Sequence, residues 1–67
     1  MDFLRHFAAN LRRERKAKGW SQEELAEQAG VDRTYVSGIE RAVRNPTITN
    51  VKRLADALGV SIGTLAD

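Results

Sequence analysis

The sequence predicts an all-α domain of five short helices. Apolar residues recur three and four positions apart through most of the chain, which is the period of a helix face rather than the alternation of a strand. A serine, threonine or aspartate precedes most of these stretches and a glycine follows them, as is usual at helix ends. The chain has 67 residues without an evident repeat, linker or low-complexity segment. We therefore expect a single domain spanning residues 1–67.

The first helix is predicted over residues 3–18, ending at Gly19. Its buried stripe consists of Leu4, Phe7, Ala8 and Leu11. Arg15 shares this apolar face, and a buried guanidinium needs a carboxylate partner. Glu40, on the buried side of a later helix, meets that need, so we predict an Arg15–Glu40 ion pair. The alternative is that Arg15 extends to solvent from the edge of the stripe.

The second helix begins after Ser21, which caps it, with Glu24 completing a reciprocal capping box. Trp20, just before the cap, is expected to pack on the start of this helix. The apolar side of the helix carries Leu25, Ala26 and Ala29. Gly30 can adopt the positive φ that ends a helix at low steric cost.

The third helix is predicted to begin after Asp32, its capping residue. Its buried stripe is expected to be Val36, Ile39 and Val43, and its opposite face carries polar side chains, namely Arg33, Thr34, Ser37 and Arg41. A helix, a glycine turn and a second capped helix with a donor-rich outer face form a helix-turn-helix arrangement.

The last third of the chain predicts two further helices. Pro46 interrupts the chain, Thr47 caps a fourth helix and Gly59 ends it. The fourth helix has an apolar stripe of Ile48, Val51, Leu54, Ala55 and Leu58. Ser61 then caps a short fifth helix that places Ile62 and Leu65 on one side.

The charges are distributed unevenly along the chain, although the net charge is only +2. Residues 1–20 contain six basic and two acidic side chains, a net +4, and residues 31–45 contain three and two, a net +1. Residues 21–30 between them carry three glutamates and no base, a net −3. Basic segments suit the phosphates of a nucleic acid, but charge alone is equally compatible with a solvated surface.

The run SQEELAEQAGV followed by DRTYVSGIER resembles the helix-turn-helix of phage repressors, Cro proteins and xenobiotic-response-element regulators. Asp32 to Arg41, with Arg44 and Asn45, resembles most closely the controller proteins of restriction–modification systems. The resemblance extends from about Leu11 to Leu65. It implies a compact five-helix, lambda-repressor-like fold and the same Arg15–Glu40 bridge. The family usually has glycine where this chain has Ala42, so either the third helix is longer here or Ala42 is strained.

A helix of this kind fits the major groove of DNA, with its N-terminal half at the base edges. We assign base reading to Arg33, Thr34 and Ser37. Gly38, which has no side chain, is expected on the same side of the helix, where it lets the helix lie deep in the groove. Arg33 can make a bidentate contact to guanine. For Thr34 and Ser37 the alternative is that they are merely exposed polar residues.

Contacts to phosphates position such a protein without carrying sequence information. The resemblance implies this role for Gln22, at the start of the second helix, and for Arg44 and Asn45 after the third. Tyr35 is a further candidate at the edge of the groove. The alternative for Tyr35 is partial burial with its hydroxyl pointing outward.

Two-fold dimers are usual in the family, with recognition helices about one DNA turn apart. Val60, Ile62 and Leu65 form surplus apolar surface near the C-terminus, so we assign them to a homodimer interface on a palindromic operator. The alternative is that these residues pack under the fourth helix.

Glu23 and Glu27 lie four residues apart on one face of the second helix. In phage repressors that this chain resembles, acidic residues at the corresponding places touch RNA polymerase, which suggests activation as well as repression. At a helix N-terminus the negative charge of Glu23 also interacts favourably with the helix dipole, which is the simpler explanation of one of the two charges.

We therefore expect a sequence-specific transcriptional regulator, either a restriction–modification controller or a phage-type or free-standing repressor. An antitoxin and a protein-interaction module without DNA contact are the alternatives. No pattern indicates an enzyme, a cofactor or a small-molecule ligand. The chain has no cysteine and a single histidine, His6, so no metal site is expected. No apolar run is long enough for a membrane span, and we expect a cytoplasmic protein of a bacterium or phage.

Overall fold

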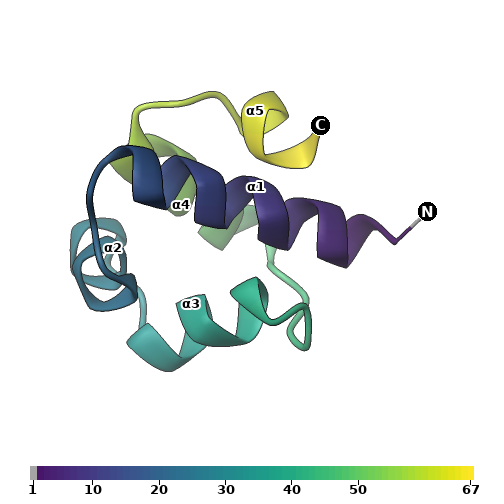
Figure 1. Cartoon of the computed structure of the whole chain (residues 1–67), viewed down its shortest axis with the longest axis horizontal. Coiled ribbons are helices and arrows are strands. Elements are labelled where there is room, and N and C mark those ends of the chain that lie inside the picture. The colour runs from purple at the N-terminus through teal and green to yellow at the C-terminus, as the bar shows by residue number, and fades with distance from the viewer. Residues whose placement is uncertain (1) are drawn as a thin grey trace.

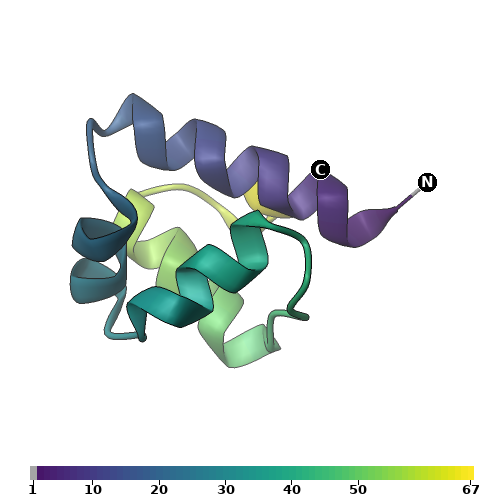
Figure 2. The same cartoon turned by 60° about the horizontal axis from the view of Figure 1, so that its bottom comes forward.

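The computed structural model describes residues 2–67, and they form five helices. The helices are α1 (Phe3–Ala17), α2 (Gln22–Ala29), α3 (Arg33–Glu40), α4 (Ile48–Leu58) and α5 (Ile62–Ala66). α1 crosses the molecule, packing against α3 on one side and α5 on the other (Figure 1). α2 packs against α3 and α4, and α3 crosses in front of α4 in the turned view (Figure 2). The expected all-α, five-helix architecture is confirmed.

One apolar core joins all five helices. Its side chains that are almost wholly excluded from solvent are Phe7, Leu11, Leu25, Val36, Ile39, Leu54 and Leu65. Small alanines of α2 and α4 complete the core and let the helices approach one another closely. Trp20 and Val31 are only partly buried and pack against its edge. The core holds α3 by one face and leaves the other available for contacts outside the chain.

The helix starts follow the predicted capping chemistry. Ser21 accepts from the backbone N–H of Glu24, while the Glu24 side chain accepts from the backbone N–H of Ser21. Asp32 caps α3, and Thr47 and Ser61 cap α4 and α5. Because these caps satisfy donors that the helix leaves unpaired, they fix where each helix begins.

Two residues predicted to lie on buried stripes are exposed. Val43 is 68% exposed because α3 ends at Glu40, before the stripe reaches it. Ile48 is 78% exposed because it is the first residue of α4, beyond the edge of the core. Both assignments were wrong because helical periodicity continues an apolar stripe beyond the residues that the core covers, past the end of α3 for Val43 and at the first residue of α4 for Ile48.

The chain leaves α3 through Ala42, which has a φ of +59°. The N–H of Ala42 donates to the carbonyl of Ile39, and the N–H of Val43 donates to that of Gly38. These two bonds form a Schellman motif, whose left-handed position is normally a glycine. Of the two possibilities stated for Ala42, the strained one is therefore present, and α3 does not run a turn longer.

No helix within residues 2–67 is both long and apolar enough to cross a membrane.

Candidate nucleic-acid interface

The first turn of α3 presents two predicted base-reading residues to solvent. Arg33 and Thr34 are exposed, whereas Ser37, one turn later, is only partly exposed. Asp32 holds this turn in place, because its carboxylate accepts from the Thr34 backbone N–H at 3.1 Å. This hydrogen bond, with a second from the Thr34 side chain and the charge of Arg33, lowers the pKa of Asp32. Among residues 2–67, no carboxylate lies within ion-pair distance of Arg33. Its guanidinium is therefore available to a ligand.

Arg44 is held against α3 by two contacts. Its guanidinium carbon lies 5.0 Å from the centre of the Tyr35 ring, within cation–π range. Its aliphatic stem covers Gly38, where an added Cβ would come 3.3 Å from the Arg44 Cβ. Gly38 is thus buried under Arg44 and does not keep a groove-facing side slim, so the predicted reason for this glycine was wrong. Because Gly38 has no side chain, the stem of Arg44 can pack directly on the α3 backbone, and we call this position the seat of Arg44.

Tyr35 is buried, at 8% exposed, which supports the burial expected in the alternative interpretation of this residue. Its hydroxyl oxygen accepts from the backbone N–H of Thr47, at the start of α4. A hydroxyl that accepts one bond still has its own hydrogen to donate. Tyr35 therefore joins α3 to α4 while keeping a donor.

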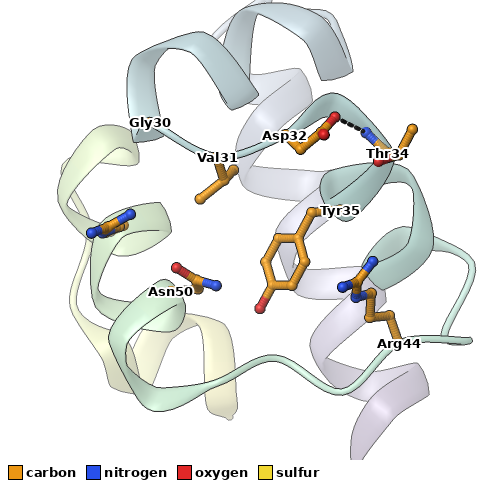
Figure 3. A pocket seen from close by; sticks show the side chains of 8 residues that line it. Gly30, Val31, Asp32, Thr34, Tyr35, Arg44 and Asn50 are labelled. Atoms are coloured by element: carbon orange, nitrogen blue, oxygen red, sulfur yellow. Dashed lines mark hydrogen bonds between the residues drawn. The ribbon is translucent and has the colours of Figure 1, made fainter.

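An open hollow of about 260 Å³ lies between α3 and the start of α4 (Figure 3). Its lining combines the turn before α3, the Tyr35–Arg44 pair and two residues of α4, and consists of Gly30, Val31, Asp32, Thr34, Tyr35, Arg44, Asn50 and Arg53. Sequence reasoning missed Asn50 and Arg53. Nothing in their local pattern distinguishes them from an exposed helix face, and only the packing of α4 beside α3 brings them to the hollow.

The predicted Arg15–Glu40 pair is present and bidentate. Arg15 Nε donates to Glu40 Oε2 at 2.7 Å, and Nη2 donates to Oε1 at 3.0 Å. The third guanidinium nitrogen donates to the carbonyl of Trp20 at 2.7 Å. Burial alone would raise the pKa of Glu40, but hydrogen bonds from Arg15 and Gln22, with the nearby charge of Arg15, outweigh it and lower that pKa. The pair joins α1 to α3 and fixes the loop before α2.

Gln22 belongs to the same cluster. Its side-chain Nε2 donates to Glu40 Oε1 at 3.0 Å, which leaves its second amide hydrogen free. Gln22 is the first residue of α2, where backbone N–H groups lack partners within the helix. The residue thus stands at a helix start that favours an anion, anchored to the buried ion pair.

The predicted dimer patch is wrong in one residue. Leu65 is fully buried against the rest of the chain and cannot form an exposed contact. The carbonyl of Leu65 accepts from the Asn10 side chain at 2.9 Å, which ties α5 to α1. Val60 is partly buried on the core, and Ile62 is 42% exposed. Only Ile62 and the edge of Val60 remain as candidate contacts, because α1 and α4 already cover the inner side of α5.

The remaining predicted residues lie at the surface. Glu23 and Glu27 are exposed on α2, and Asn45 is exposed in the loop after α3. No group of three potential metal-binding side chains occurs within the described part of the chain.

Comparison with known proteins places this geometry in a family. Residues 11–65 match a family model described as helix-turn-helix. The chain belongs to this family, of the phage-repressor and Cro type. A curated relative named a hypothetical transcription factor, from Neisseria meningitidis, is 56% identical over 54 residues, covering 81% of this chain and 51% of the relative. The chain thus spans about half the length of that relative.

Two solved structures illustrate the breadth of the similarity. The restriction–modification controller protein C.AhdI of Aeromonas hydrophila matches with a TM-score of 0.90 and 47% identity, covering 92% of this chain and 94% of that one. SinR, described as the master regulator for biofilm formation and solved in complex with DNA, matches with a TM-score of 0.88 and 42% identity. That match covers 91% of this chain and 98% of the SinR chain. The same fold therefore occurs in controller proteins and in a regulator of another kind.

Proposed function

We propose that this protein is a sequence-specific transcriptional regulator that binds DNA with α3 in the major groove. The observation that carries the proposal is the capped first turn of α3, with Arg33 and Thr34 exposed. Gln22 lies beside the C-terminal end of α3, where it bonds Glu40, and the Tyr35-supported Arg44 lies beside the middle of the helix, over Gly38. Base-reading groups flanked by phosphate-binding groups are the arrangement that specific DNA recognition requires. We take residues 1–67 as one DNA-binding unit.

We further propose that the protein binds a palindromic operator as a homodimer. A single recognition helix contacts few base pairs, and two-fold symmetry doubles the contacts. The exposed Ile62 supports a contact through α5. Ile62→Glu should give a folded monomer with weak operator binding, and a sedimentation experiment that still finds a dimer would place the interface elsewhere.

Selection of bound DNA from a random pool tests the main proposal. Enrichment of one palindromic sequence is expected, with binding that weakens steeply as salt increases, because phosphate contacts release counterions. Recovery of no preferred sequence, with the folded chain confirmed by circular dichroism, would contradict it. Arg33→Ala should weaken binding to the selected operator far more than binding to random DNA. Equal losses on both DNAs would reassign Arg33 to phosphate contact.

The role in the cell is proposed as that of a restriction–modification controller, since the segment from Asp32 to Asn45 resembles those proteins and the controller C.AhdI is 47% identical to this chain. The similarity to SinR favours a free-standing regulator as the second candidate. Neighbouring genes decide between them, because a controller is expected beside a methyltransferase and a nuclease. An acidic α2 surface at Glu23 and Glu27 supports activation through contact with RNA polymerase.

A further inference from the structure

The hollow between α3 and α4 collects donors and two positive charges. Arg44 and Arg53 line it, together with the side chains of Thr34, Tyr35 and Asn50 (Figure 3). No carboxylate of residues 2–67 lies within ion-pair distance of either arginine. This contrasts with Lys52, the neighbour of Arg53 on α4, which lies 3.4 Å from the carboxylate of Asp56. The hollow is therefore a concave surface whose two cations form no ion pair within residues 2–67.

We propose that this hollow binds a phosphodiester of the DNA backbone, with Arg53 and Asn50 of α4 as contact residues outside the helix-turn-helix. The inference rests on the proposed DNA-binding function and extends it to a second helix. Charge-assisted hydrogen bonds from guanidinium to phosphate are strong and are favoured wherever bidentate recognition of phosphate is needed.

Arg44 is preorganised for this role. Its stem lies on Gly38 and its guanidinium lies over the Tyr35 ring, so its side chain is restrained before any ligand binds. A restrained side chain loses less conformational entropy on binding than a free one. Arg44 thus supplies one fixed charge at one end of the hollow, and Arg53 supplies a second from α4.

Neutral donors complete the hollow. The Tyr35 oxygen already accepts from the Thr47 N–H, so the hydroxyl hydrogen remains available to an anion. Asn50 lies near that hydroxyl and contributes an amide (Figure 3). Asp32 is the one carboxylate in the lining, and it lies toward the far end from Asn50, where it accepts from the Thr34 N–H. Two arginines against one aspartate leave the lining net positive.

The position of the hollow favours a DNA phosphate over a small free anion. Thr34 both lines the hollow and belongs to the first turn of α3, so a duplex that receives α3 in its groove brings its backbone to the same edge. The hollow is also open to solvent, which suits one phosphate of a long polymer better than an ion that must be enclosed.

The test compares Arg53→Gln with Lys52→Gln, a matched control on the same helix with the same change of charge. Affinity for the selected operator is measured as a function of salt concentration. Loss of one phosphate contact should reduce the magnitude of the slope of log K against log salt by about 0.9. Arg53→Gln should show this change and about a fivefold or greater loss of affinity at 150 mM salt, on operator and random DNA alike. Lys52→Gln should show less than half of either effect.

A neutral methylphosphonate placed at successive operator positions then locates the contact. At one position the substitution should weaken binding of the wild-type chain clearly more than binding of Arg53→Gln, in which only Arg44 and the neutral donors of the hollow still contact that phosphate. Equal slopes for the two variants, or equal methylphosphonate profiles for the wild-type chain and Arg53→Gln, would overturn the inference and leave the proposed function standing. A wild-type chain that binds no DNA would instead overturn the function itself.

A titration of the DNA-free chain with inorganic phosphate separates the two sources of the anion. No saturable binding below millimolar concentration is expected. Saturable binding that is lost in Arg53→Gln, with an unchanged salt slope on DNA, would make the hollow a site for a small anion and overturn its assignment to the DNA backbone.

Discussion

Arg15 and Glu40 meet in two parallel hydrogen bonds, Nε to Oε2 at 2.7 Å and Nη2 to Oε1 at 3.0 Å, although they lie 25 residues apart. The Glu40 side chain is fully buried and that of Arg15 is 11% exposed. In such surroundings each charge needs an opposite partner, because an unpaired buried charge is very costly. Glu40 also has Arg12 nearby, whose Nε lies 3.6 Å from Oε1. The pair also receives Gln22 and holds the Trp20 carbonyl, so it connects the core with the start of α2.

Removal of one partner should therefore cost more than half of the stability that is lost when both are removed. Arg15→Met and Glu40→Leu are each expected to lower the free energy of unfolding by about 3–5 kcal/mol. The double variant should lose clearly less than the sum, because neither charge is then left unpaired. Urea and thermal unfolding of the four proteins measure this. Additive losses would contradict an energetic coupling between the two side chains.

The lowered pKa of Glu40 predicts a loss of stability in acid. The folded state holds this carboxylate ionised, so it binds fewer protons than the unfolded state, in which a glutamate has a pKa of about 4.3. The stabilisation is complete above that value and is lost as pH falls through the lower pKa of the folded state. Asp32 acts in the same direction. An NMR titration of the Glu40 carboxyl carbon gives the folded value directly, and a result at or above about 4.3 would refute the prediction.

Ala42→Gly should stabilise the protein. Ala42 occupies the left-handed position of the Schellman motif after α3, where a Cβ is unfavourable and glycine is not. We expect a gain of about 1 kcal/mol and a rise of about 4–8 °C in Tm. Ala9→Gly, at an exposed position inside α1, is the matched control and should cost about 1 kcal/mol instead. A lower Tm for Ala42→Gly would show that its backbone is not strained.

Features of the fold that depend on neighbouring residues are visible in the sequence, whereas those that depend on distant contacts are not. Helix starts at Ser21, Asp32 and Thr47 were predictable because a capping side chain acts on backbone groups two or three residues away. Exposure of Val43 and Ile48 was not predictable, since it depends on where the core ends.

The same distinction applies to the candidate interface. The position of Arg33 and Thr34 on the first turn of α3 was predictable from the capping residue before it. The bridge between Arg15 and Glu40 was predictable because both charges lie on apolar stripes. The seat that Gly38 offers to Arg44, and the approach of Arg53 to the hollow, arise only when α4 and the preceding loop fold back on α3. Such contacts have no signature in residue spacing.

Gly38→Ala tests whether Arg44 is positioned by its seat. The new methyl group would lie 3.3 Å from the Arg44 Cβ, so the Arg44 stem must shift outward by a few tenths of an ångström, while alanine improves the helix by about 0.5–1 kcal/mol. The free energy of unfolding should therefore change by less than about 1 kcal/mol, and operator affinity should fall about threefold or more. Arg44→Ala provides the control. Adding Gly38→Ala to it should cost no further affinity, and a further loss of the same size would show that Gly38 acts independently of Arg44.

The acidic surface of α2 is expected to contact a basic surface of a partner. Glu23 and Glu27 are exposed and stand one turn apart, and no basic side chain of residues 2–67 lies within ion-pair distance of either. Like charges at this spacing destabilise a helix slightly, so their presence suits a basic partner surface. If that partner is RNA polymerase, Glu23→Gln with Glu27→Gln should abolish activation and leave operator binding intact. Electrostatic contacts at such a rim add specificity and weaken with salt, so wild-type activation should also decline as salt rises within the range where DNA remains bound.

The control for this experiment is Glu14→Gln with Asp56→Asn, which removes two negative charges elsewhere on the molecule. Transcription from a promoter that carries the selected operator is measured beside operator binding for all three proteins. The control should activate like the wild-type chain, because a change in net charge alone should not affect activation. If activation survives the Glu23 and Glu27 changes at every promoter tested, the polymerase contact is refuted. The two glutamates then serve only the helix dipole and hydration of α2.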